Sequence, residues 1–134
     1  MNVQIIIKLL TVILFLAQPV ITMAGDLTPE TFLQADVETR QLTLDGMSQQ
    51  IQLLNMGATD DQINKIVSDN QINIETLFNS FGTTGSAHSA YGTKNREAVE
   101  IWMVNNPEWQ QHYDALDAEF ATLSQQLSTL REGL

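Results

Sequence analysis

Two stretches of the sequence carry apolar residues at alternating spacings of four and three, the pattern of an α-helix with one buried seam. Each stretch spans 22 positions, from 33 to 54 and from 109 to 130. A helix with one apolar stripe buries that stripe against another element. The equal lengths therefore predict two long helices packed side by side. The seam positions are Leu33, Val37, Arg40, Leu44, Met47, Ile51 and Leu54, and Trp109, Tyr113, Leu116, Phe120, Leu123, Leu127 and Leu130.

Helix start and stop signals flank both stretches. Thr28-Pro29-Glu30 supplies a hydroxyl cap, a proline in the first turn and an acid near the positive end of the helix dipole. Asn106-Pro107-Glu108 repeats this order, and Gly57 is placed to close the first helix. Apolar residues between them predict three shorter helices, over about 59–69, 74–81 and 95–105. The predicted fold is all-α, a small helical bundle built on two long helices (about 28–56 and 107–131) with three shorter helices and one long Gly/Ser/Thr loop.

Two residues inside the first seam depart from the apolar pattern. Gly46 costs about 1 kcal/mol relative to alanine in a helix, so it indicates either a close helix crossing or a bend. Arg40 stands at a seam position. Either its stem packs and its guanidinium reaches solvent, or it meets a buried acid; we favour the first alternative.

Residues 1–24 have the order of an export signal. Lys8 precedes an apolar run over 9–17, and Thr22 and Ala24 place small residues before the expected cut at Gly25. The run is shorter than the roughly 20 apolar residues that span a bilayer, so we expect cleavage and no stable membrane insertion afterwards, the alternative being an uncleaved amino-terminal anchor. The sequence therefore predicts one helical domain over 25–134, exported to the periplasm or the extracellular space.

The mature chain is strongly acidic and has no cysteine. Removing residues 1–24 leaves five basic and sixteen acidic side chains, a net charge of −11. Such a surface repels nucleic acid, so we expect no nucleic-acid partner. The absence of cysteine excludes disulfides, thiolate metal sites and a cysteine nucleophile.

Residues 82–95 have no helical periodicity and are rich in glycine, serine and threonine, so we expect one long loop there. No aspartate or glutamate occurs over 76–96, although the rest of the chain is acidic. Cationic and hydroxyl side chains close to a helix start can bind an anion such as a phosphate or a carboxylate. The alternative is a solvated connector. The candidate ligand- or partner-binding residues are His88, Tyr91, Lys94, Arg96 and Trp102.

No motif indicates catalysis or a cofactor. No strand-turn-helix elbow accompanies Ser86 or Ser89, and the glycines at 82 and 85 match no phosphate-binding fingerprint. Glu108 and His112 share a helix face, but two ligands are too few for a metal site. We therefore expect a non-enzymatic binding protein for a protein, a peptide or an anionic small ligand. The alternatives are a helical homo-oligomer assembled through the two seams and an enzyme with a dispersed site.

Overall fold

The computed structural model describes residues 27–133, and over this range the chain is all-α, as predicted. Its five helices are α1 (Pro29–Asn55), α2 (Asp60–Ser80), α3 (Gly85–Lys94), α4 (Arg96–Asn105) and α5 (Glu108–Glu132). The predicted signal segment and its cleavage point lie outside the described residues. No helix within 27–133 has the length and apolar character needed to span a membrane.

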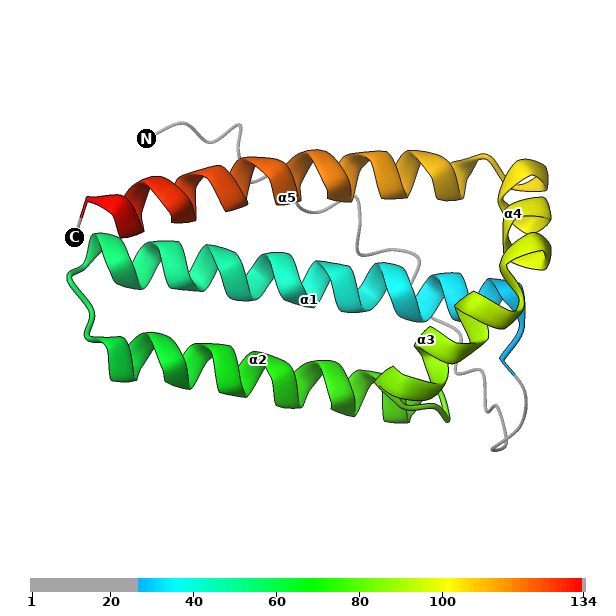
Figure 1. The fold of residues 1–134 in the computed structure, drawn as a ribbon, viewed down its shortest axis with the longest axis horizontal. Coiled ribbons are helices and arrows are strands. Elements are labelled where there is room, and N and C mark those ends of the chain that lie inside the picture. The colour runs from blue at the N-terminus through cyan, green and yellow to red at the C-terminus, as the bar shows by residue number, and fades with distance from the viewer. Residues whose placement is uncertain (1–26, 134) are drawn as a thin grey trace, which may run out of the picture.

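The three long helices form a single layer with α1 in the middle (Figure 1). α2 flanks α1 on one side and α5 on the other, and α2 and α5 do not touch. α1 and α5 run in the same direction, whereas α2 runs in the opposite direction. The short helices α3 and α4 cross one end of the layer and carry the chain from α2 past α1 to α5. Two helices of ten residues, each about 15 Å long, suffice to cross two interhelical spacings of about 8–10 Å.

Local chemistry sets the helix ends that the sequence predicted. The Thr28 and Thr59 hydroxyls accept backbone N–H groups of the first turns of α1 and α2. Gly57 and Gly82 follow these two helices with φ of 73° and 71°, a left-handed conformation that favours glycine. The Ala58 N–H bonds the Leu53 carbonyl at 2.9 Å, which completes a Schellman motif at the end of α1.

The two predicted seams meet each other along α1 and α5. Leu44, Met47, Leu116 and Leu127 form one buried cluster, with Val37, Ile51, Leu54 and Leu123 packed around it. Burying one such side chain fully stabilises the fold by about 1.5–3 kcal/mol. Phe120 is the exception, because half of its surface remains exposed although it stands at a seam position.

The expectation of a helix end near Asp69 was wrong. α2 continues from Asp60 to Ser80 as one helix, where the sequence predicted two short ones. The reason is the contact between α1 and α2: a Cβ atom at Gly46 would lie 2.7 Å from the Asn70 side chain. Gly46 therefore marks a close helix crossing, and Asn70 is the residue that packs at the crossing.

The expectation of a loop over 82–95 was also wrong, because most of it forms α3. The Thr84 hydroxyl accepts the Ala87 N–H at 3.1 Å and caps the helix. At the other end, the Asn95 side chain donates to the Tyr91 carbonyl at 3.1 Å. The segment therefore holds its polar residues at helical spacings against α1.

Candidate functional site

An open groove of about 560 Å³ lies between α1, α3 and the start of α4. It takes most of its wall from the segment without acids. Serine and threonine hydroxyls, an imidazole, a guanidinium and a carboxylate border it. Its lining residues are Phe32, Asp36, His88, Ser89, Gly92, Thr93 and Arg96.

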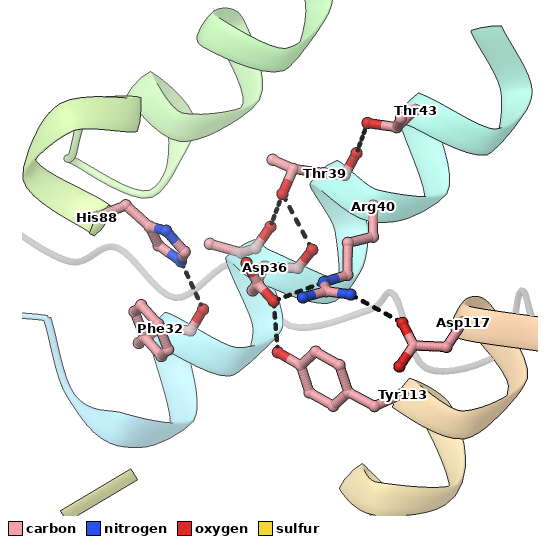
Figure 2. Close-up of polar contacts among 9 residues, drawn as sticks. Phe32, Asp36, Thr39, Arg40, Thr43, His88, Tyr113 and Asp117 are labelled. Carbon is pink, nitrogen blue, oxygen red and sulfur yellow. Dashed lines mark hydrogen bonds and ion pairs between the residues drawn. The ribbon is translucent and has the colours of Figure 1, made fainter. Parts of the chain in front are cut away.

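Aromatic packing fixes the inner wall of the groove. The His88 ring stacks on Phe32 with centroids 4.2 Å apart, and Phe78 of α2 lies 4.9 Å from the same ring. His88 Nε2 is 3.0 Å from the Phe32 carbonyl oxygen (Figure 2). Because a carbonyl only accepts, Nε2 carries the proton and donates this hydrogen bond. His88, 5% exposed, therefore ties α3 to both α1 and α2.

Gly92 lets α3 approach α1 closely. A Cβ atom at this position would lie 2.7 Å from Cζ of Phe32. The Phe32 ring is held between His88 and Tyr91, whose ring centroid is 5.3 Å away, so it has little room to yield. The groove therefore depends on glycine at this point of α3.

A polar network borders the groove on the α5 side. Tyr113 Oη donates to Asp36 Oδ2 at 2.7 Å, and Arg40 contacts Asp36 at 2.9 Å and Asp117 at 3.0 Å (Figure 2). The Arg40 guanidinium also lies 5.0 Å from the Tyr113 ring centre. The arginine is about half exposed, and neither of its acidic partners is buried, so its guanidinium reaches solvent, as in the alternative that the sequence favoured.

The network perturbs the ionisation of two of its members. Burial, followed by the negative charge of Asp36, raises the pKa of Tyr113 well above its ordinary value, so the phenol stays protonated as a donor. Burial of Arg40 opposes its charge, but the interactions with Asp36, Tyr113 and Asp117 together outweigh burial and raise the pKa of Arg40. Both shifts favour the protonated donors that hold Asp36 in place.

Two of the predicted site residues serve mainly in packing. His88 is a buried aromatic contact whose edge reaches the groove. Tyr91 is partly buried against Phe32, and burial raises its pKa. The structure thus brings His88 and Tyr91 together at one aromatic cluster.

The other three predicted residues lie apart from that cluster. Lys94 is exposed in the last turn of α3, where a cation is favourable near the negative helix end. Arg96 lines the groove and forms an ion pair with Glu100 at 2.7 Å. Trp102 is partly buried, and its indole Nε1 is buried without a hydrogen-bond partner among residues 27–133. Of the five predicted residues, His88 and Arg96 line the groove.

Sequence reasoning missed the groove residues that α1 contributes, Phe32 and Asp36. Both residues lie off the apolar seam of the first helix. One signal was available in the missed helix: Thr84, His88, Tyr91 and Asn95 recur at spacings of four, three and four. Once this periodicity is accepted, the helix presents its ring side chains on one face.

A second hollow, of about 270 Å³, lies between α1 and α5 beyond the polar network. Leu44 and Leu116 form its apolar base, and the exposed Phe120 ring stands at its edge. Its lining residues are Arg40, Thr43, Leu44, Leu116, Asp117 and Phe120.

No group of three or more potential metal-ligating side chains gathers within residues 27–133. Glu108 and His112, the pair singled out in the sequence, are exposed on α5.

The chain has no significant similarity to known proteins. No protein-family model matches it, and neither a curated protein nor a solved structure is significantly similar to it.

Proposed function

We propose that this chain is an exported, non-enzymatic binding protein that holds an extended segment of a partner protein in the groove between α1, α3 and α4. The export part of the proposal is supported by the charge, length and small-residue pattern of residues 1–24. The binding part is supported by the chemistry of the groove, described next.

The observation that carries the proposal is the mixture of groups along the open groove. Arg96 offers a cation, Asp36 offers an anion, and the exposed Ser89 and Thr93 offer hydroxyls. The Ser89 hydroxyl makes no hydrogen bond within residues 27–133, and hydroxyls pair with peptide N–H and C=O groups alike. The aromatic wall at Phe32 suits an apolar side chain. Together these groups match a polypeptide segment with both polar backbone and mixed side chains.

Two further features favour a polymer over an enclosed substrate. The groove is open along its length, whereas a small-molecule site encloses 70–90% of its ligand. The cation at Arg96 also shares its charge with Glu100, so a partner carboxylate there competes with an existing ion pair. We therefore place a peptide segment ahead of a free anion as the ligand.

Blocking the groove tests the proposal with a matched control. Thr93→Arg places a long side chain in the groove, and Thr76→Arg makes the same change on α2. Both threonines are exposed, and both hydroxyls bond the carbonyl four residues earlier, at 3.2 and 2.8 Å. Each variant is immobilised and exposed to the envelope fraction of the producing cells. Segments of each recovered protein are then synthesised and titrated against both variants.

The expected result is a partner that Thr76→Arg binds as the wild type does and Thr93→Arg binds at least about tenfold more weakly. Equal affinity of the two variants for every recovered segment would refute the groove as the binding site. Circular dichroism of both variants checks that the helical fold is retained.

A further inference from the structure

Phe120 is out of place for a seam residue. It is 50% exposed, whereas Leu116 and Leu127 of the same seam are buried. The ring stands at the edge of the 270 Å³ hollow, whose base is apolar. Nothing within residues 27–133 covers this side of α5, because α2 lies on the opposite flank of α1. An exposed ring beside an apolar hollow is typical of an interaction surface.

Three cross-helix bonds define the face to which Phe120 belongs. They join Asp36 to Tyr113, Arg40 to Asp117 and Gln50 to Arg131, the last at 3.2 Å. On each helix the bonded residues and the surface positions between them recur at spacings of three, four or seven, so they form one stripe per helix. We call this surface the bridged face; it comprises Asp36, Arg40, Thr43 and Gln50 of α1 and Tyr113, Asp117, Phe120, Ser124 and Arg131 of α5.

The charge of the bridged face favours a second copy of this chain as its binding partner. The mature chain has a net charge of −11, so two copies repel one another across most of their surfaces. The bridged face carries two aspartates and two arginines, and its own net charge is zero. Two identical copies therefore meet here without net charge repulsion between the facing patches, and an apolar ring lies near the centre of the same surface.

The order of charges along the face also fits a two-fold axis. Asp36 bonds Tyr113, so the two residues lie at the same height along the parallel helices. The point halfway between this height and Arg131, counted along α5, falls near position 122. A two-fold axis there sets Arg131 of each copy level with Asp36 of the other. The two Phe120 rings then lie about 6 Å apart along the helix direction, since each is two residues from the axis at 1.5 Å per residue.

We propose that two copies of this chain pair antiparallel through the bridged face, with Phe120 at the centre of the contact. The interface is isologous, because the same patch serves both copies. The bridged face shares Asp36 with the peptide groove, but Phe120 at its centre does not line the groove, so the two proposals are tested at different residues. It uses the exposed edge of the two seams, at Arg40, Tyr113 and Phe120, and leaves the buried seam contacts within one chain intact.

Sedimentation velocity and native mass spectrometry of the protein as recovered from cells test the proposal. The wild type is expected to form a dimer whose fraction rises with concentration. Phe120→Asp should raise the dimer dissociation constant about a hundredfold, since two rings lose their burial and two like charges meet. Ile72→Asp is the matched control: Ile72 is 61% exposed on α2, and its replacement should leave the dissociation constant unchanged.

A second measurement keeps the test informative if Phe120→Asp disturbs folding. The chain has no cysteine, so Ser124→Cys and Ser68→Cys each accept one spin label at a unique site. Ser124 lies two residues from the proposed axis, whereas Ser68 lies on α2. Pairing through the bridged face gives a short distance between labels at 124 and a longer one at 68. A monomer at all concentrations, a dimer that Phe120→Asp leaves intact, or a shorter distance at 68 would each overturn the proposal.

Discussion

The hydrogen bond from Tyr113 to Asp36 is a partly buried link between α1 and α5 whose contribution to stability depends on pH. Tyr113→Phe removes the donor and keeps the ring. Asp36 retains its contact with Arg40, so the loss should be near the lower end of the 1.5–3 kcal/mol typical of a hydrogen bond to a charged group. At about pH 8 we therefore expect the variant to unfold with a free energy about 1.5 kcal/mol below that of the wild type.

The sign of the pH effect follows from the raised pKa of Tyr113 in the folded state. Because the folded pKa is raised, the stabilisation from Tyr113 is fully present below the pKa of the unfolded phenol, about 10, and is lost as the pH rises above that value. At about pH 11.5 the unfolded wild type gains about 2 kcal/mol from ionising this phenol, at 1.36 kcal/mol per pH unit. The variant has no phenol at this position. The difference between the two proteins should therefore fall to within about 0.5 kcal/mol of zero.

Urea unfolding followed by circular dichroism, at intervals from about pH 8 to pH 11.5, measures this difference directly. Lysine ionisation affects wild type and variant alike and cancels, as does the remaining Tyr91. A gap between the two proteins that stays constant over the whole range would refute the reasoning. It would mean that Tyr113 ionises in the folded protein as easily as in the unfolded chain.

Three further outcomes are expected. Leu44→Ala, at a residue 2% exposed, should lower the free energy of unfolding by about 2–5 kcal/mol, whereas Met56→Ala, at a residue 80% exposed, should change it by less than about 0.5 kcal/mol in denaturant titrations. Gly92→Ala should destabilise the wild type by about 1 kcal/mol, because overpacking against Phe32 outweighs the gain in helix propensity, and should stabilise a Phe32→Ala background, a reversal that the same titrations detect. Mass spectrometry of the exported protein should give a chain that starts at Gly25, and an intact Met1 terminus in the exported fraction would contradict the cleavage.

The long helices were predictable because their ends and their seams are encoded locally. A threonine cap and an adjacent proline begin α1, and Gly57 closes it through a backbone conformation that other residues avoid. The four-three spacing of apolar residues places them on one face of each helix, and this face is the one that is buried between α1 and α5. At Gly46 the sequence left a close crossing and a bend as alternatives, and it did not identify Asn70 as the residue that packs there.

The candidate site was less predictable because tertiary contacts create it. α3 contains two glycines and several hydroxyl residues, which are poor helix formers, and it is held by the His88 contacts with α1 and α2. A histidine in such a segment indicates a ligand-binding residue, whereas in the structure His88 packs between two phenylalanines. Asp36 gives no signal in the sequence, since its place beside the groove depends on α3 crossing α1 at Gly92.

The central position of α1 has a consequence for the order in which the chain acquires structure. α1 contacts each of the other four helices. It is synthesised before them, yet α5, the partner that buries most of its seam, is synthesised after all of them. The α1–α2 hairpin closes over a short stretch of chain, but the contact from Asp36 to Tyr113 spans 77 residues and carries a larger loop-closure entropy. The cooperative core is thus completed only when α5 is available.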